Sequence, residues 1–384
     1  MKPAPHSGLP VRPADEPSKR FQRQGAKVVL VGVGNIGGQF VDHAARLAGL
    51  KRVLVVDRDR YETANLTSQA ITARDVGRPK AAVQARRLRR LNPRLQVEAF
   101  AGDLDSLPLG WLRGAVVIGC LDSVHSRLRL GEMAWRMGAL FLDGGVNPEA
   151  GLARVTCYLP GPARACCACG LSAEDYQAMG AVAPCDGSPE APATSGTFAL
   201  GGLAAAWLAL ECERILRDGP DANVAGREVL LETGAGRLLV SRRRSNPACR
   251  FDHRTWTITP LAGLTASATL AEAIEFAGRL PNTTKSPVLR LPGQRLAKAL
   301  HCPGCGAMVE CFHVVGRGGP RECPRCRRRP LAVVGFKIVD RVDHHLPRAL
   351  LRRSLRRVGL RPGDVLAAEC GGHTRYLEIP TEDA

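Results

Sequence analysis

The sequence is poor in aromatic residues and has no long apolar run. Phe, Trp and Tyr make up 4% of its 384 residues and form no row of stacking platforms for nucleic-acid bases. No segment reaches the roughly 18 uninterrupted apolar residues of a membrane-spanning helix. The first residues are rich in Pro and charge, without the apolar core of a secretory signal. We therefore expect a cytoplasmic protein without a membrane partner.

Acidic residues are outnumbered by basic ones, and the formal net charge is +18, mostly from arginine. Such an excess fits a nucleic-acid ligand, electrostatic steering of an acidic protein partner, or a plain arginine bias of the composition. The sequence has no helix-turn-helix pattern, which makes nucleic acid the least favoured of the three. The candidate basic faces are the arginine runs 242–244, 327–329 and 352–357.

The most informative segment is K27-V-V-L-V-G-V-G-N-I-G37, in which three glycines follow an apolar run. Gly32, Gly34 and Gly37 have the G-x-G-x-x-G spacing of a nucleotide-binding turn. The first permits the tight turn, the second lets backbone approach a phosphate, and the third lets the helix pack on the strand. The pattern predicts a buried strand from Val28 to Val31 and a helix from Ile36 to Ala48.

Polar side chains after a second predicted strand, Val53 to Val56, point to ATP and away from a nicotinamide. Asp57 ends this strand, where a carboxylate can accept hydrogen bonds from ribose hydroxyls. Lys80, roughly 20 residues further on, suits the rim of a triphosphate site. Asp122 follows the predicted strand Ala115 to Gly119 and could hold Mg²⁺. The remaining residues of the predicted ATP site are Asn35, Asp59, Asn65 and Gln69.

Taken in order, these motifs resemble those of the ThiF/MoeB/HesA adenylyltransferases, the bacterial relatives of ubiquitin-activating enzymes. The resemblance covers roughly residues 27–253. Its motifs are G32-V-G-N-I-G37, D57-R-D59, N65-L-T-S-Q69, G77-R-P-K80 and C120-L-D122. The resemblance implies ribose binding by Asp57, phosphate binding by Asn65, Gln69 and Lys80, and Mg²⁺ binding by Asp122.

Two positions bear on the positive charge at the α-phosphate. Ser68 stands where the family usually has Arg, so Arg74 or an Arg from elsewhere would have to replace it. The family also delivers an Arg across a homodimer from an R-Y-x-R-Q element near the N-terminus. The segment R20-F-Q-R-Q24 fits these letters, so Arg20 or Arg23 either reaches the ATP of a partner subunit or belongs to a plain basic lead-in.

The chemistry that the resemblance implies is adenylation of a carboxylate. The C-terminal carboxylate of a small β-grasp protein attacks the α-phosphate of ATP, and pyrophosphate leaves. The enzyme positions the reactants and neutralises charge. Because the attacking carboxylate is already ionised, no general base is needed.

The chain has 14 cysteines, which in a reducing compartment indicate metal sites before disulfides. The stronger cluster pairs C302-P-G-C305 with C323-P-R-C326, the spacing of a zinc ribbon. We expect Cys311, between the two knuckles, to be left out of the site. Such a small module buries little core, so metal binding would supply much of its folding free energy. The predicted zinc ligands are Cys302, Cys305, Cys323 and Cys326.

A second metal cluster is expected from A165-C-C-A-C169 and N246-P-A-C-R-F-D-H253. The family resemblance implies zinc between a C-x-x-C pair and a second pair near the end of the domain. Cys167 is an alternative to Cys166 as a ligand. The predicted Cys₃His site consists of Cys166, Cys169, Cys249 and His253.

A single cysteine, Cys185, lies in a segment rich in Pro, Gly and Ser, which predicts a loop before an apolar helix over residues 196–216. Family members that transfer the activated protein onto themselves keep a cysteine in this crossover loop. A thiolate there attacks the acyl-adenylate and forms a thioester. We therefore predict that Cys185 is the nucleophile, with a free loop thiol as the alternative; Lys80 and Arg23 complete the predicted catalytic set.

We expect an α/β protein with a Rossmann-like, mostly parallel sheet covered by helices on both faces, plus a C-terminal zinc ribbon and a small α/β region. The expected parts are a flexible N-terminal segment (1–26), an ATP-binding adenylation domain (27–255), a connecting region (256–298), the ribbon (299–330) and a C-terminal α/β region (331–384). The later predicted elements are a strand or hairpin over 228–242, a helix over 270–277, a strand over 331–339, an arginine-rich helix over 348–358 and closing strands over 364–369 and 374–379.

Three functions stay open at this point. The first is an ATP-dependent activating enzyme for a ubiquitin-like protein with a C-terminal Gly, paired with a conjugating enzyme as in bacterial conjugation systems, which often serve antiphage defence. The second is a sulfur-carrier adenylyltransferase of a thiamin, molybdopterin or thiolation pathway. The third is a zinc-containing nucleic-acid-binding protein with a degenerate nucleotide fold. The appended ribbon and the lack of a rhodanese-like loop favour the first, by family analogy.

Overall fold

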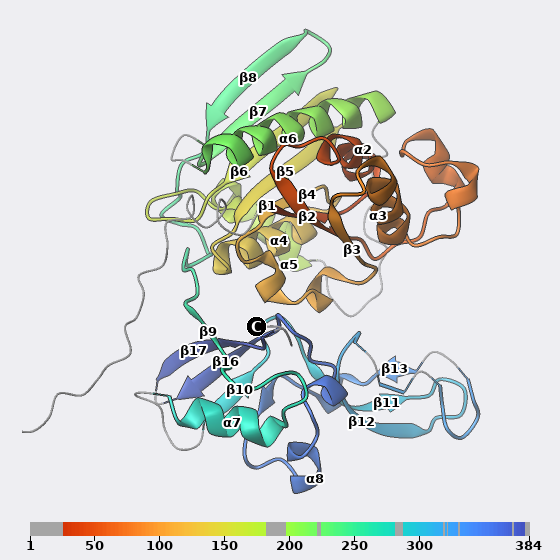
Figure 1. The fold of residues 1–384 in the computed structure, drawn as a ribbon, viewed down its shortest axis with the longest axis vertical. Coiled ribbons are helices and arrows are strands. Elements are labelled where there is room, and N and C mark those ends of the chain that lie inside the picture. Colours follow the sequence, from red (N-terminus) through yellow and green to blue (C-terminus); the bar gives the residue numbers. More distant parts are fainter. Residues whose placement is uncertain are drawn as a thin grey trace, which may run out of the picture.

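An eight-stranded sheet organises the N-terminal part of the chain (Figure 1). The computed structural model describes residues 26–181, 197–220, 224–280, 287–317, 319–320, 322–328, 331–370 and 372–380. The strand order is β3-β2-β1-β4-β5-β6-β7-β8, parallel from β3 to β5 and antiparallel from there to β8. The strands are β1 (Ala26–Val31), β2 (Leu50–Val56), β3 (Gln96–Phe100), β4 (Val116–Gly119), β5 (Leu140–Asn147), β6 (Leu152–Tyr158), β7 (Arg227–Glu232) and β8 (Arg237–Arg242).

The chain order reverses between β1 and β4, as in Rossmann-like folds, where ligands bind outside the carboxyl ends of the strands at this switch point. Both faces of β1 are buried: Val28 and Leu30 belong to one core, Val29 and Val31 to another. On the first face lie α2 (Asn35–Ala44), α3 (Lys80–Leu91) and α6 (Phe198–Asp218), and on the second lies α4 (Val124–Arg136). The predicted fold class is thereby confirmed.

Short elements connect the sheet to these helices. They are α5 (Ala173–Ala181) and the 3₁₀ helices η1 (Thr63–Thr67), η2 (Ala73–Asp75), η3 (Leu104–Ser106), η4 (Leu109–Leu112) and η5 (Cys167–Gly170). The helix predicted to end at Ala48 ends at Ala44, where single turns take over. Within the described ranges, no helix combines the length and the apolar character that crossing a membrane requires.

Residues 256–380, here called the C-terminal module, form two further sheets. One has the order β15-β10-β16-β17-β9 and encloses its own core with α7. The other is a small sheet around β11 that carries the C-x-x-C knuckles. The elements are β9 (Ile258–Pro260), α7 (Leu270–Gly278), β10 (Val288–Arg290), β11 (Leu296–His301), β12 (Met308–Val314), β13 (Ala332–Val333), η6 (Gly335–Lys337), β14 (Ile338–Val339), β15 (Arg341–Val342), α8 (Arg348–Leu351), η7 (Arg356–Val358), β16 (Val365–Cys370) and β17 (His373–Glu378).

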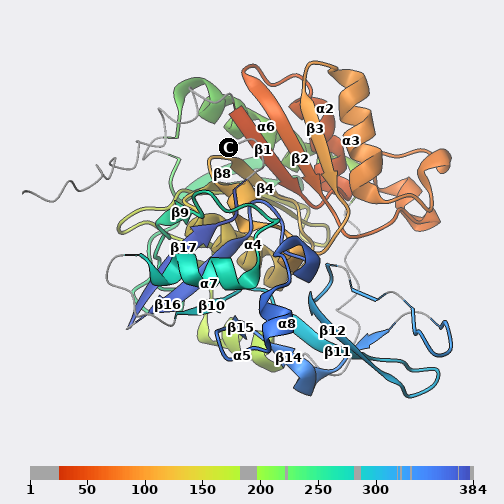
Figure 2. The same cartoon turned by 60° about the horizontal axis from the view of Figure 1, so that its bottom comes forward.

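The C-terminal module docks on the side of the large sheet that carries α4, away from α2 and α3 (Figure 2). Trp111 in η4 donates from Nε1 to the Pro362 carbonyl at 3.0 Å, and Arg113 forms an ion pair with Glu378. Trp256, which stacks on Tyr376 within the module, donates its backbone N–H to the Arg136 carbonyl of α4 at 2.8 Å. These contacts bury apolar surface and pair charges between the module and the nucleotide-binding part.

Two predicted elements of this module were wrong. The strand expected over 331–339 is interrupted by η6, so that β13 and β14 pair with opposite ends of β11. The helix expected over 348–358 stops at Leu351. The backbone N–H of Leu355 instead donates to the Ala268 carbonyl at 2.8 Å, and that of Arg356 to the Ala266 carbonyl at 2.7 Å. Pairing with the segment before α7 replaces the helical hydrogen bonds.

Candidate nucleotide site and metal clusters

The glycine turn between β1 and α2 is held by close backbone contacts. Gly32 has φ +83°, and a Cβ atom added there would lie 2.5 Å from the Cys120 carbonyl oxygen. A Cβ on Gly37 would lie 2.0 Å from the Gly32 oxygen. At Gly34 the nearest atom to an added Cβ, Nε2 of Gln69, is 3.7 Å away. The first and third glycines are therefore needed for packing, whereas the second leaves backbone accessible to a phosphate.

Asp57, at the end of β2, faces this turn. Its Oδ2 accepts from the backbone N–H of Val33 at 2.8 Å, and its Oδ1 accepts from that of Asp59 at 2.9 Å. Burial raises the pKa of Asp57, while these two hydrogen bonds and Lys80 oppose the rise. Each carboxylate oxygen keeps a second lone pair, so the group can still accept hydrogen bonds from two ribose hydroxyls.

Lys80 opens α3 on the rim of the crevice. Its Nζ lies 3.5 Å from Oδ2 of Asp59 and 5.7 Å from the centre of the Tyr61 ring. Tyr61 donates its hydroxyl to the Val33 carbonyl at 2.9 Å and accepts from Nε2 of Gln84 at 2.7 Å. Burial raises the pKa of Tyr61 above its usual range, so the phenol stays neutral.

Sequence reasoning missed the supporting pair of Tyr61 and Gln84. Both are buried, and they connect α3 to the glycine turn. A signal was present: Gln84 is a polar residue on the buried side of an amphipathic helix, between Val83 and Ala85. Such a residue needs a partner inside the fold.

The predicted phosphate-binding amides differ in their surroundings. The Gln69 side chain lies against Gly34, and its Oε1 is buried without a hydrogen-bond partner among the described residues. An amide oxygen accepts hydrogen bonds, so the partner that this atom lacks is a donor, whereas a phosphate oxygen would engage the Nε2 group of Gln69. Asn65, in η1, uses its Oδ1 to accept from the backbone N–H of Glu62 at 2.9 Å. Its Nδ2 group is the part that a phosphate oxygen would engage.

Asn35 links the glycine turn to the start of α6. Its Nδ2 donates to the Thr197 carbonyl at 3.0 Å, and Gln39 donates to the Phe198 carbonyl at 2.8 Å. Asp122 lies exposed just after β4, directly before Ser123, whose hydroxyl caps α4. Strands β1 and β4 are parallel neighbours, with Gly32 directly after β1 and Asp122 shortly after β4. The structure thus places Asp122 at the same carboxyl edge of the sheet as the glycine turn.

Cys185, Arg20 and Arg23 lie outside the described residues. Ser68 ends η1 half-buried, and Arg74 lies exposed in η2.

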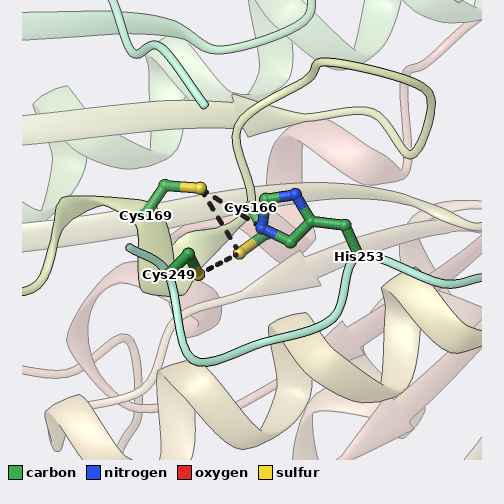
Figure 3. A group of neighbouring side chains, drawn as sticks. All are labelled: Cys166, Cys169, Cys249 and His253. Carbon is green, nitrogen blue, oxygen red and sulfur yellow. Dashed lines mark hydrogen bonds between the residues drawn. The ribbon is translucent and has the colours of Figure 1, made fainter. Parts of the chain in front are cut away.

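The structure brings Cys166, Cys169, Cys249 and His253 together (Figure 3). The Cys166 sulfur lies 3.8 Å from that of Cys169 and 3.7 Å from that of Cys249. Nε2 of His253 lies 3.3 Å from the Cys169 sulfur. A tetrahedral ion with metal–sulfur bonds of about 2.3 Å has sulfur–sulfur edges of about 3.8 Å, so the donors fit such an ion.

The surroundings of this cluster hold its ligands in place. Trp135 of α4 donates from Nε1 to the His253 carbonyl at 3.0 Å, and Arg136 pairs with Asp252 at 2.5 Å. His253 has φ +54°, a left-handed conformation that a non-glycine residue rarely adopts without compensation. Cys167, the alternative ligand, is not part of the cluster and lies against Gly131 instead.

The second cluster joins the two C-x-x-C knuckles of the ribbon. The sulfurs of Cys302 and Cys326 lie 3.5 Å apart, and those of Cys305 and Cys323 lie 3.6 Å apart. A hydrogen bond from the Cys326 backbone lowers the pKa of Cys323 to about 6, which favours the thiolate form that metals bind. Cys311 instead donates its thiol to the Ala297 carbonyl.

Comparison with known proteins gives a consistent result. Residues 15–297 match the ThiF family. The sulfur carrier protein adenylyltransferase of Thermus thermophilus is 31% identical over 243 residues, which are 61% of this chain and 85% of that protein. The catalytic subunit of the NEDD8-activating enzyme E1 of Saccharomyces cerevisiae is 29% identical over 155 residues, 38% of this chain and 51% of that protein. The match thus spans about half the length of the yeast relative.

Among solved structures, E. coli MccB with ATP is similar with a TM-score of 0.47 and 20% identity. The similarity covers 61% of this chain and 68% of that chain.

Substitutions at two glycines of the turn should have different effects, one on stability and the other on ATP binding. Gly37→Ala should lower the free energy of unfolding by about 1–3 kcal/mol, because its methyl group collides with backbone that cannot move away. Gly34→Ala should keep the wild-type melting temperature within a few degrees but bind ATP more weakly, because the methyl group occupies the phosphate approach. Thermal melts and fluorescent-nucleotide titrations measure the two effects. Wild-type ATP affinity in Gly34→Ala would show that phosphate does not approach there.

Proposed function

Since the chain belongs to the ThiF family, we propose that it activates the C-terminal glycine of a ubiquitin-like protein by ATP-dependent adenylation and then carries it as a thioester. It is an enzyme of the adenylyltransferase class. The observation that carries the proposal is the glycine turn at the carboxyl end of β1, together with Asp57 at the end of β2. There the turn is open only at Gly34, and the Asp57 carboxylate faces that turn.

Different residues of this site would bind different parts of ATP. Asp57 holds the ribose, and Lys80, Asn65 and Gln69 bind the phosphates. Asp122 would hold Mg²⁺, which supplies charge neutralisation on the phosphates when bound. The carrier's carboxylate oxygen attacks the α-phosphorus, a mixed anhydride forms, and the bond to pyrophosphate breaks. No proton moves in this step, so the chain's contribution is positioning and charge.

The first test is pyrophosphate exchange with small β-grasp proteins that end in Gly. Lys80→Ala should reduce exchange by about 100-fold or more, because the side chain is expected to contact transition-state charge, while carrier binding changes little. Asp122→Ala should abolish Mg²⁺-dependent exchange and leave the melting temperature unchanged.

The control is Arg46→Ala, whose guanidinium bonds to the Asp42 carbonyl on the outside of α2. Full exchange in Asp122→Ala would remove the magnesium role, and equal loss of carrier binding and exchange in Lys80→Ala would remove the phosphate role.

We propose that both Cys/His clusters hold zinc. Thiolate and imidazole ligands in tetrahedral spacing suit this ion, and the donor distances above fit it. The Cys₃His site would fasten the end of α4 to the loop that carries His253, through Trp135 and Arg136. The ribbon site would hold together a small sheet with little core of its own.

Metal analysis should therefore find zinc for both clusters, two ions per chain. Cys249→Ser and Cys326→Ser should each remove one ion, because each substitution deletes one of four ligands. Cys311→Ser is the control and should retain both. A single zinc in the wild type, or an unchanged content in Cys249→Ser, would rule out the Cys₃His site.

The thioester proposal rests on where the segment with Cys185 begins and ends. It starts after α5, beside the Cys₃His cluster, and ends at Thr197, whose carbonyl accepts from Asn35 of the glycine turn. The 12 positions between Cys185 and Thr197 give the chain enough length for a thiol at residue 185 to reach an adenylate at the glycine turn. Thiolate attack on the mixed anhydride then releases AMP and gives a thioester.

Incubation with ATP and the carrier should produce an adduct that thiol reductant removes on a gel, and Cys185→Ala should lack it. Cys157→Ala provides a control, because its thiol is buried in the sheet. An adduct that persists in Cys185→Ala would contradict the assignment of the nucleophile.

We further propose a homodimer that buries the outer side of α6. Leu203 and Leu210 are 42% and 56% exposed there. Leu238 and Val240 of β8 face the same side of the sheet and are 50% and 56% exposed. Because α6 starts at the glycine turn, a second copy on this surface could bring its Arg23 or Arg20 to the neighbouring ATP site.

Sedimentation velocity should find a dimer at micromolar concentration that Leu210→Glu dissociates, since a buried unpaired charge is costly. Leu239→Glu, on the opposite side of β8, should leave it intact. A dimer that survives Leu210→Glu would exclude this surface.

The alternative function is a sulfur-carrier adenylyltransferase, supported by the 31% identity to the Thermus enzyme across 85% of its length. It would form the adenylate without a lasting thioester, so the gel assay separates the two. A conjugating enzyme, a reducing cytoplasm and a role in antiphage defence belong to the first proposal. The nucleic-acid-binding alternative has the +18 charge and the proposed zinc ribbon in its favour.

A further inference from the structure

A row of alternating charges crosses the sheet on the α4 side, from β5 to β7. Arg127, in the first turns of α4, donates from Nη1 to Oδ1 of Asp143 at 2.6 Å and to the Gly144 carbonyl at 2.8 Å. Arg154 of β6 donates to Oδ2 of the same carboxylate at 2.5 Å and lies 3.6 Å from Glu228 of β7. Each oxygen of Asp143 is thus held by a different guanidinium group.

The row carries an excess of positive charge. Its last member, Arg243, donates to Glu228 at 2.8 Å. Three guanidinium groups therefore face two carboxylates, which leaves one positive charge. The Asp143 side chain is 3% exposed, whereas that of Arg127 is 16% exposed. The uncompensated charge is partly buried, where it attracts an anion more strongly than a solvated arginine does.

The row lies beside the glycine turn. Val31, Gly119 and Asp143 are register partners on β1, β4 and β5. With adjacent strands roughly 4.8 Å apart, Asp143 is about 10 Å across the sheet from the strand that enters the turn. Between them lies Cys120, which follows Gly119 of β4 and whose carbonyl lies against Gly32.

The proposed reaction needs a cation at this position. It brings a carboxylate against a triphosphate, and two anions repel each other as they approach. Ser68 cannot supply the positive charge, and Lys80 already lies 3.5 Å from the Asp59 carboxylate. Of the arginines in the row, Arg127 is the one that follows β4 along the chain, in α4; its side chain is 16% exposed, and it shares the Asp143 carboxylate with Arg154.

We propose that Arg127, positioned by Asp143, is the binding site for the C-terminal carboxylate of the carrier. This inference rests on the proposed function and assigns the substrate anion to one side chain. Arg127 pairs with the carboxylate before attack. As one carboxylate oxygen bonds to the α-phosphorus and the pyrophosphate oxygen leaves with its electron pair, Arg127 stays protonated and releases the neutral acyl group.

The site is tested by titration with a synthetic heptapeptide ending in Gly-Gly, as the free acid and as the C-terminal amide. The protein is first saturated with α,β-methylene-ATP and Mg²⁺, which cannot turn over. Wild type should prefer the acid by about 10- to 100-fold, the range of a charge-assisted hydrogen-bond pair. Arg127→Gln should bind acid and amide alike, with unchanged affinity for the nucleotide.

Two further variants keep the test decisive. Arg129→Gln, two positions along the same helix, loses a guanidinium that pairs with Asp105 and Glu132 and should keep the wild-type preference. Arg127→Lys retains the ion pair with Asp143 but not the fork geometry, so it should fold and lose part of the preference. This variant decides the matter if Arg127→Gln fails to fold.

The possible failures are distinguishable. If wild type binds the nucleotide and exchanges pyrophosphate but Arg127→Gln or Arg127→Lys keeps the full preference for the acid, the carboxylate site is wrong and the proposed function stands. If wild type does not bind the nucleotide at all, the proposed function fails, and the carboxylate site fails with it.

Discussion

The structure depends on one steric constraint at the end of β1. Gly32 lies so close to the Cys120 carbonyl, and Gly37 so close to Gly32, that neither position has room for a Cβ atom. This contact brings α2 down onto the sheet and sets the ends of β1 and β4 side by side. Asp57 is then hydrogen-bonded to the turn at Val33, and the amide of Gln69 lies against Gly34. A looser turn would separate the groups that a nucleotide must contact together.

Helix α4 packs on the large sheet and contacts both the loop of the Cys₃His cluster and the C-terminal module. Its first turn carries Arg127. Its last turn carries Trp135 and Arg136, which form a hydrogen bond and an ion pair with the loop of the Cys₃His cluster. The C-terminal module docks on the same side of the sheet, where Trp256 donates its backbone N–H to the Arg136 carbonyl at 2.8 Å. The loop of the Cys₃His cluster and the C-terminal module therefore both contact the helix that carries Arg127.

Local elements were predictable where residues close in the chain decide them. The strand Val28–Val31 and the hairpin of β7 and β8 follow from apolar runs and turn glycines, and the structure confirms both. The strand expected over 331–339 and the helix expected over 348–358 failed, because distant backbone partners on β11 and before α7 competed for their hydrogen bonds. Propensity is a weak prior when such tertiary pairing is available.

The sequence by itself determined the glycine spacing, the acid after β2 and the four-residue knuckles, since each is a geometry of neighbouring residues. The meeting of Cys166 with Cys249, 83 positions away, was expected from the family resemblance and not from any local pattern, and the structure brings the two together. Only the tertiary structure decided that Tyr61 and Gln84 support the turn. It also decided that Arg127, Asp143 and Arg154 share charge across three elements. The order of the strands in the sheet determines which of these residues come into contact. That order depends on how the faces of the sheet and helices pack, and no local sequence pattern fixes it.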